Sequence, residues 1–188
     1  TDFTFMSTKD AQLFVNSPNA IEGNYEEKCD TSSAQYQSEQ TGLVDVTGDE
    51  DQILAKIREL ICMLPANNED DASYEECTDD LNRVCENLAG CAGDTALALA
   101  QISDNHVFFQ VKENYAKDMV TGFIKLNGIT VGAVANRSEV YDMDGNKGEE
   151  FDGCLTSRGC RKAAQFVRFC DAFSIPVLTL TNVTGYSA

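Results

Sequence analysis

The stretch MVTGFIKLNGITVGAVA, residues 119–135, decides the fold of this chain. Two runs rich in β-branched and aromatic residues flank the dipeptide Asn127-Gly128, which is the strongest short signal for a two-residue hairpin turn. The stretch therefore predicts two antiparallel strands, 119–126 and 129–135, joined by a tight turn.

A helix and a further strand are predicted after this hairpin. Apolar residues recur with helical spacing between residues 160 and 173. They are Cys160, Ala163, Ala164, Phe166, Val167, Cys170 and Phe173. Pro176 then opens the apolar run Val177-Leu178-Thr179-Leu180, which is typical of a buried parallel strand. The order strand, helix, strand predicts an α/β layer with a crossover connection.

The first third of the chain carries weaker signals. Strand-like runs occupy residues 3–6 and 13–15, and residues 22–48 are predicted to form a polar loop with short helical pieces. Thr47 and Glu50 have the spacing of a capping box, which predicts an amphipathic helix that ends before Pro65. Its apolar positions are Ile53, Leu54, Ile57, Leu60, Ile61 and Leu64.

Acidic segments interrupt the two halves. Residues 67–80 hold seven Asp and Glu residues and predict an exposed linker, followed by helices around 81–88 and 95–102. A second half begins near His106, and residues 139–153 are predicted to form an irregular acidic loop.

Composition excludes several classes of function. The 188 residues include 31 Asp and Glu against 14 Lys and Arg, a net charge of −17 that repels nucleic-acid backbones and anionic membranes. No uncharged apolar run is long enough to span a bilayer, and Thr1-Asp2-Phe3 lacks the pattern of a signal segment. We expect a cytoplasmic chain that is a piece of a longer protein. The eight cysteines contain no CxxC pair, and we expect reduced structural thiols.

Local motifs supply no active site. Asp142, Asp144 and Asn146 suggest a calcium loop, but their register does not fit an EF-hand, and a solvated acidic loop is the better interpretation. His106 is the single histidine and stands beside an apolar run, where packing or capping is commoner than catalysis. Nucleophile-elbow and phosphate-binding glycine patterns are absent, and no metal is expected.

Longer stretches carry a resemblance to a known family. They are TDFTFM at 1–6, KDAQLFVNSP at 9–18, NYAK at 114–117, VTGFIKLNG at 120–128, VGAVAN at 131–136, KAAQFVRFCDAF at 162–173, IPVLTL at 175–180 and NVTGY at 182–186. Together they resemble biotin-dependent acyl-CoA carboxyltransferases: the β subunits of acetyl- and propionyl-CoA carboxylases and the methylmalonyl- and glutaconyl-CoA decarboxylase α subunits. Asn182 stands where the family's Asp-Val-Pro-Gly-Phe loop has its Asp, and Thr156 stands where many members have Asp.

The resemblance implies a crotonase-like (ClpP/crotonase) α/β superhelix. Residues 1–66 would be the end of the N-terminal carboxyltransferase half-domain, 67–105 an acidic linker with helices, and 106–188 the start of the C-terminal half-domain. The two catalytic oxyanion loops are expected outside the chain, so no catalytic residue is assigned within it. Gly185 and Tyr186 are the expected substrate-binding residues; a turn glycine and a packing aromatic are the alternatives.

The resemblance also implies the chemistry and the partners. The parent enzyme would transfer a carboxyl group between carboxybiotin and a short-chain acyl-CoA, with biotin on a separate carrier protein or domain. We expect a homo-oligomer that meets a biotin carboxyl carrier protein, and a decarboxylating parent would associate with a membrane complex. The isolated chain is expected to be inactive and to self-associate. A non-catalytic crotonase-like interaction module is the alternative.

Overall fold

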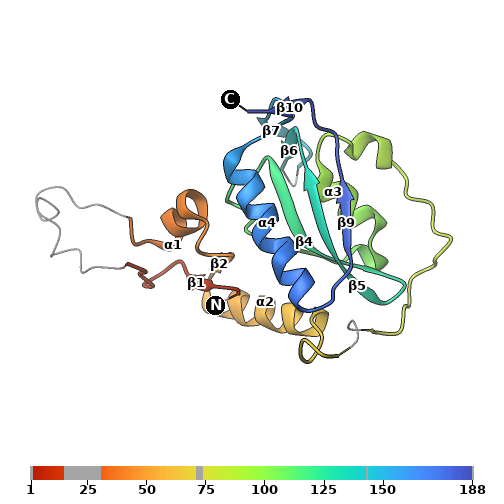
Figure 1. The fold of residues 1–188 in the computed structure, drawn as a ribbon, viewed down its shortest axis with the longest axis horizontal. Helices are drawn as coiled ribbons and strands as arrows, with labels where there is room; N and C mark the ends of the chain where they lie inside the picture. Colours follow the sequence, from red (N-terminus) through yellow and green to blue (C-terminus); the bar gives the residue numbers. More distant parts are fainter. Residues whose placement is uncertain (1, 15–30, 71–73, 143, 188) are drawn as a thin grey trace, which may run out of the picture.

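A computed structural model describes residues 2–14, 31–70, 74–142 and 144–187 as a mixed α/β structure (Figure 1). A four-stranded sheet at its centre has the order β3-β4-β5-β9. These strands are β3 (Phe108–Val111), β4 (Met119–Leu126), β5 (Ile129–Asn136) and β9 (Val177–Leu180). The first three are antiparallel, whereas β9 runs parallel to β5, with Gly132 opposite Val177. The predicted strand–helix–strand unit is therefore confirmed.

The hairpin turn has the geometry that its sequence predicts. Asn127 and Gly128 have φ angles of 51° and 77°, and the register pairs Leu126 with Ile129. A side chain at Gly128 would overlap the carbonyl oxygen of Glu75, whose N–H donates to the Gly128 carbonyl at 3.0 Å. Both the left-handed conformation and the close approach of a second segment therefore require glycine at this position.

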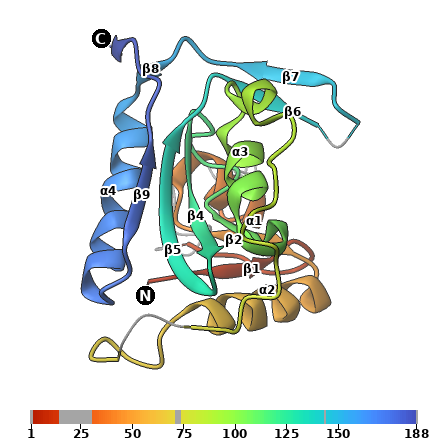
Figure 2. The ribbon, with the colours of Figure 1, turned by 90° about the vertical axis from the view of Figure 1, so that its right-hand side faces the viewer.

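Two helices cover the two faces of the sheet. Figure 2 shows α4 (Ser157–Ala172) on one side and α3 (Thr95–Ile102) on the other. Strand β4 alternates accordingly: Phe123 joins Phe166 of α4 in one core cluster, while Ile124 joins Leu99 of α3 in another. Because successive strand residues point to opposite faces, β4 is buried on both of its faces.

The first part of the chain packs beside this sheet. Strands β1 (Phe5–Ser7) and β2 (Val46–Gly48) pair in parallel, and helix α2 (Glu50–Met63) follows. A three-residue helix α1 (Ala34–Tyr36) and a π-helical turn η2 (Gln37–Thr41) precede β2, within the predicted loop. Residues Leu60 and Met63 of α2 belong to the same core cluster as Phe123, so the first part and the sheet share one core.

The capping box of helix α2 lies two residues later than predicted. Asp49, not Thr47, is the N-cap: its carboxylate accepts from the Gln52 N–H at 2.9 Å, and the Gln52 side chain accepts from the Asp49 N–H at 3.0 Å. Asp49 and Gln52 have the same spacing as Thr47 and Glu50, and β2 occupies the earlier position. Two of the predicted apolar positions of this helix do not face the core, because Leu54 and Ile61 are 60% and 65% exposed.

The predicted helix over residues 81–88 is wrong. Only a 3-10 turn, η3 (Leu88–Cys91), forms there, and Asn87 adopts a left-handed φ of 61°. The guanidinium of Arg83 donates to the carbonyls of Gln101 and Ser103 at the end of α3, and pairs with Asp79 at 2.9 Å. These contacts tie the 81–88 segment to the C-terminal end of α3.

The acidic segment 139–153 is more regular than predicted. It contains a hairpin of β6 (Glu139–Tyr141) and β7 (Lys147–Glu150), and β8 (Cys154–Leu155) follows it. Lys147 forms ion pairs with Glu139, at 2.7 Å, and with Glu150, which offsets the repulsion between carboxylates on paired strands.

The remaining predictions for the first part have mixed outcomes. Gln12 makes an isolated bridge to Ser33. Leu13 and Phe14 form no strand, and Val15 lies outside the described residues.

The cysteines of the described residues are thiols, not disulfides, and Cys29 lies outside the described residues. They are Cys62, Cys77, Cys85, Cys91, Cys154, Cys160 and Cys170.

Candidate functional site

The loop after β9 returns to the end of the sheet where β8 lies. Its last residues form β10 (Gly185–Tyr186), which pairs in parallel with β8, Gly185 opposite Cys154. The Thr184 N–H donates to the Gly153 carbonyl at 3.1 Å, and the Ser187 N–H donates to the Leu155 carbonyl at 3.0 Å. Figure 2 shows β8 and the C-terminus at the end of the molecule where β6 and β7 also lie.

The two predicted site residues lie on an accessible strand. A Cβ built on Gly185 meets nothing within 4 Å, so the backbone there faces open space. Tyr186 is 81% exposed and therefore does not serve as a packing aromatic within the described residues. The arrangement leaves the ring of Tyr186 exposed and the space on the Cβ side of Gly185 open to a ligand.

Asn136 joins this loop to the central sheet. Its side-chain Nδ2 donates to the Asn182 carbonyl at 2.8 Å, and its Oδ1 accepts from the Asn182 N–H at 2.7 Å. Asn136 is the last residue of β5 and is 6% exposed. One buried amide thus holds the main chain at the start of the loop.

A groove of about 670 Å³ lies beside β8. Its lining includes Asp152, Cys154 and Thr156, the N-cap of α4. Carboxylates outnumber cations among the charged lining residues, which are Glu39, Asp118, Glu149, Glu150, Asp152, Lys117 and Arg158. This excess of negative charge disfavours phosphate groups as occupants.

The N-terminus of α4 in this groove is already satisfied. Thr156 Oγ1 accepts from the Gly159 N–H at 3.0 Å and donates to the Asp118 carboxylate at 2.7 Å. A Cβ on Gly159 would approach that carboxylate to 2.8 Å, so Asp118 sits against the first turn of the helix. A carboxylate of the chain itself therefore lies beside the N-terminus of α4, where it disfavours a bound anion.

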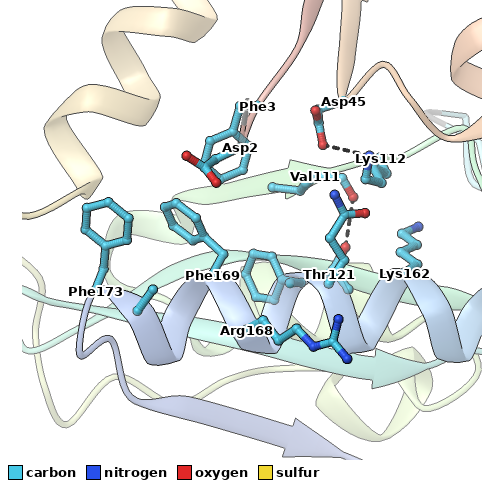
Figure 3. Close-up of a pocket in the computed structure, with 13 residues that line it drawn as sticks. Asp2, Phe3, Asp45, Val111, Lys112, Thr121, Lys162, Arg168, Phe169 and Phe173 are labelled. Atoms are coloured by element: carbon cyan, nitrogen blue, oxygen red, sulfur yellow. Dashed lines mark hydrogen bonds and ion pairs between the residues drawn. The ribbon is translucent and has the colours of Figure 1, made fainter. Parts of the chain in front are cut away.

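A second cavity, of about 250 Å³, lies between the first part of the chain and α4 (Figure 3). One end is aromatic, with the Phe169 ring centroid 4.7 Å from those of both Phe3 and Phe173. The other end is polar, with Lys162 near the ion pair of Asp45 and Lys112.

Lys162 at this polar end is 2% exposed. Burial, followed by the charge of Arg137, lowers the pKa of Lys162 to about 7. Its ammonium donates to the Tyr115 and Ala116 carbonyls at 2.7 and 3.4 Å, so the side chain anchors that loop to α4.

The remaining sequence candidates are not parts of a site. His106 is exposed, and its Nδ1 lies 3.2 Å from the Ala100 carbonyl oxygen at the end of α3. Asp142 accepts from the N–H groups of Asp144 and Asn146, at 2.9 and 2.8 Å, which forms the turn between β6 and β7. These N–H donors, that of Asn146 foremost, hold the pKa of Asp142 below its usual value. Among the described residues no cluster of His, Cys, Asp and Glu is placed to hold a metal ion.

Sequence reasoning did not single out Asn136 or Lys162. Each has a signal in retrospect: a lysine among the apolar positions of an amphipathic helix, and an asparagine directly after a buried strand run. Neither signal shows which backbone groups the side chain contacts, because those groups are far away in the sequence: Asn182 is 46 positions from Asn136, and Tyr115 is 47 positions from Lys162.

The sequence matches the carboxyl transferase domain family over residues 1–188. The chain therefore belongs to this family of carboxyl transferase domains, as the resemblance of its longer stretches predicts.

Particular relatives are enzyme subunits of that class. The chain is 33% identical over 197 residues to the propionyl-CoA carboxylase beta chain of Roseobacter denitrificans, covering 99% of this chain and 37% of that protein. It is 30% identical over 197 residues to the methylmalonyl-CoA decarboxylase subunit alpha of Veillonella parvula, with the same coverage of both chains. The chain thus spans little more than a third of the length of either relative.

A solved structure supports the same assignment. Transcarboxylase 12S, described as a hexamer with methylmalonyl-coenzyme A and methylmalonic acid bound, superimposes with a TM-score of 0.84 at 30% identity. The match covers 100% of this chain and 36% of that one. The crotonase-like fold class is confirmed by this likeness.

Within the described residues, none of the helices has the length and apolar character that crossing a membrane requires.

Proposed function

We propose that this chain is the central part of a carboxyltransferase subunit that moves a carboxyl group between carboxybiotin and a short-chain acyl-CoA. The observation that carries the proposal is the family match across residues 1–188. The chain contributes scaffold and one accessible loop, residues 182–186, at the end of the sheet. The isolated chain is expected to be inactive, because the oxyanion loops of the family are expected in other parts of the protein.

The proposed chemistry depends on backbone donors. Removing a proton next to a thioester carbonyl creates an enolate, and N–H groups in a water-poor site stabilise the developing negative charge. This explains why the sequence shows no catalytic triad. The scaffold that we propose for such a site is the sheet with its two covering helices, and the support for Gly185 is the open space where a side chain would lie.

The carboxyl group would be exchanged with carboxybiotin, and the biotin would be carried on a separate protein or domain. Its ureido ring is neutral and planar, and the open space at Gly185 fits the approach of such a ring or of a thioester to the main chain. The exposed ring of Tyr186 offers a flat apolar surface beside it. The acidic groove behind β8 fits neither the phosphates of coenzyme A nor a carboxylate.

The partners and the setting complete the proposal. We propose a homo-oligomer that receives a biotin carboxyl carrier protein, and a cytoplasmic location, for which the thiol state of the described cysteines is the support. The division into 1–66, 67–105 and 106–188 stays a prediction. Leu60 and Met63 of the first part share a core with Phe123 and Phe166 of the last, so these parts do not pack independently.

The second candidate is a non-catalytic interaction module. Leu54 and Ile61 lie one heptad apart on α2 and are both more than half exposed, as a helix that packs against a partner would show. An oligomeric enzyme subunit requires the same surface, so exposure alone does not separate the two candidates.

Carboxyl exchange separates them. The full-length protein that contains this sequence is mixed with a biotinylated carrier and with radiolabelled methylmalonyl-CoA or propionyl-CoA, and label on the carrier or on the acyl-CoA is measured. Transfer supports the enzyme. No transfer with any short acyl-CoA, from a protein that assembles normally, would reject the enzyme in favour of the interaction module.

A further inference from the structure

We propose that Asn136 is a positioning residue for the loop 182–186: its side-chain amide fixes the main chain of Asn182 and thereby aligns Gly185 and Tyr186 for a ligand. The proposal rests on the function proposed above, because it assigns a supporting residue to the same loop. Nothing in the sequence patterns or in the comparisons points to Asn136 in this role.

The geometry of the contact uses both ends of one amide. Asn136 Nδ2 donates to the Asn182 carbonyl at 2.8 Å, while Asn136 Oδ1 accepts from the Asn182 N–H at 2.7 Å. The Asn136 side chain thus makes the two hydrogen bonds to the Asn182 main chain that a paired strand would make. Two hydrogen bonds in opposite directions fix the position and also the rotation of the Asn182 peptide groups.

The Asn136 main chain is itself held rigidly. It pairs with Met119 of β4 at the end of the hairpin, and its carbonyl accepts from Thr95 Oγ1 at 3.1 Å. Asn136 is 6% exposed and Thr95 is 7% exposed, so water competes little for these hydrogen bonds. We call the contact of the Asn136 amide with the Asn182 main chain the clamp. Because Asn136 is fixed in the sheet, the clamp fixes the start of the loop relative to the sheet.

A second tether holds the far side of the loop. Thr184 Oγ1 donates to the Asp152 carbonyl at 3.3 Å, and β10 pairs with β8. Strand β8 has two residues and follows the exposed β6–β7 hairpin, whereas β5 lies inside the four-stranded sheet. Asn136 thus ties the loop to the core of the molecule, and β8 ties it to a peripheral segment.

Only an amide of this length satisfies both contacts. Aspartate has no Nδ2 donor, so a carboxylate oxygen would face the Asn182 carbonyl oxygen at 2.8 Å. Alanine leaves both main-chain groups of Asn182 without the side-chain partner. Thr121 provides a matched control, because Thr121→Val removes a buried hydrogen bond from Thr121 Oγ1 to the Val111 carbonyl, at 3.0 Å, and leaves the contacts of Asn136 in place.

The clamp is tested first in the chain itself by amide hydrogen exchange. In Asn136→Asp and Asn136→Ala, the amides of Asn182, Thr184 and Ser187 are expected to exchange at least about tenfold faster relative to the amides of β4, in line with the loss of ~1.4 kcal/mol of local protection. Thr121→Val is expected to leave these three amides as slow as in the wild type, apart from any change in global stability. Unchanged exchange of the three amides in both Asn136 variants, with the native fold retained, would overturn the clamp.

The positioning role is tested in the full-length enzyme by carboxyl transfer. Misplacing a group by about 1 Å can cost about a hundredfold in rate, so Asn136→Asp is expected to lower kcat by roughly that factor with a smaller change in KM for acyl-CoA. Thr121→Val is expected to keep kcat. A loosened loop with wild-type kcat would overturn the positioning role. Absence of transfer in the wild-type enzyme would reject the proposed function together with this role, while the exchange result alone would still decide the clamp.

Discussion

Lys112 and Asp45 form a buried ion pair that joins the first part of the chain to the central sheet. Lys112 Nζ lies 3.2 Å from Asp45 Oδ1, and the two side chains are 7% and 3% exposed. The same ammonium donates to the Gly42 carbonyl, and the Lys112 N–H donates to the Asp45 carbonyl at 3.2 Å. Lys112 adopts a left-handed φ of 54°, a strained conformation that these contacts between two segments maintain.

Removing the cation of this pair is expected to be costly. Lys112→Met leaves Asp45 buried without its counter-charge, and breaking a buried pair from one side costs ~3–5 kcal/mol. Burial already raises the pKa of Asp45, so the loss in the variant should shrink in acid, where the carboxyl group is protonated. Urea unfolding at pH 7 and at acidic pH measures both effects. The double variant Asp45→Asn with Lys112→Met should lose less; an equal or larger loss would contradict the explanation.

The stability of the chain is expected to rise with pH above neutrality. Burial lowers the pKa of Lys162 to about 7, whereas the unfolded chain titrates near 10.5. Between these values the unfolded state binds a proton that the folded state has released, so the free energy of unfolding increases with pH. Urea midpoints should rise in the wild type between pH 7 and about pH 8.5; at higher pH the buried Cys170 thiol, whose pKa burial raises to about 12, acts in the opposite direction. Lys162→Met should flatten the rise and the exposed Lys9→Met should not; parallel curves for wild type and Lys162→Met would refute the assignment.

Two glycines with similar φ angles are expected to differ in tolerance. Gly128 (φ 77°) lies against the Glu75 carbonyl, whereas at Gly145 (φ 80°) an added Cβ would have no neighbour within 4 Å. Gly145→Ala should cost ~1 kcal/mol, which is the cost of the left-handed backbone alone. Gly128→Ala should cost at least ~2–3 kcal/mol, because the segment that contains Glu75 must also move. Equal losses in thermal or urea unfolding would show that the contact with Glu75 contributes nothing.

Gly185 offers a test that separates function from folding. Gly185→Ala places a methyl group in open space and should change the free energy of unfolding by less than ~0.5 kcal/mol. If a ligand approaches the main chain there, carboxyl transfer by the full-length enzyme should fall at least about tenfold, which corresponds to ~1.4 kcal/mol. Gly90→Ala, also in open space, serves as the control. Wild-type transfer rates in Gly185→Ala would remove this glycine from the site.

The elements with a regular period could be predicted from the sequence. The 119–136 hairpin, helix α4 and strand β9 form within a few residues of their expected bounds, because alternation, helical spacing and turn residues all favour the same structure there. Helix α3 coincides with the predicted 95–102. The failures occur where side chains make contacts that periodicity does not reveal: Arg83 of the 81–88 segment donates to the carbonyl of Gln101, and Lys147 pairs with Glu139 across a hairpin in an acidic stretch.

The candidate site could be predicted only through resemblance. The NVTGY stretch indicates Gly185 and Tyr186, which lie side by side in β10, Gly185 half-buried and Tyr186 exposed. Their support by Asn136 could not be read from spacing, since it joins positions far apart through an amide and two main-chain groups. Periodicity identifies which residues face a core, but it does not identify such polar contacts.

The pairing of β5 with β9 sets the order in which this molecule can assemble. The β4–β5 hairpin closes over two residues and can form within microseconds, whereas the register of Gly132 with Val177 must wait until α4 has crossed the sheet. Strands β1 and β2 likewise bring position 5 to position 46. The hairpin can therefore nucleate early, while these two long-range parallel pairings limit the folding rate.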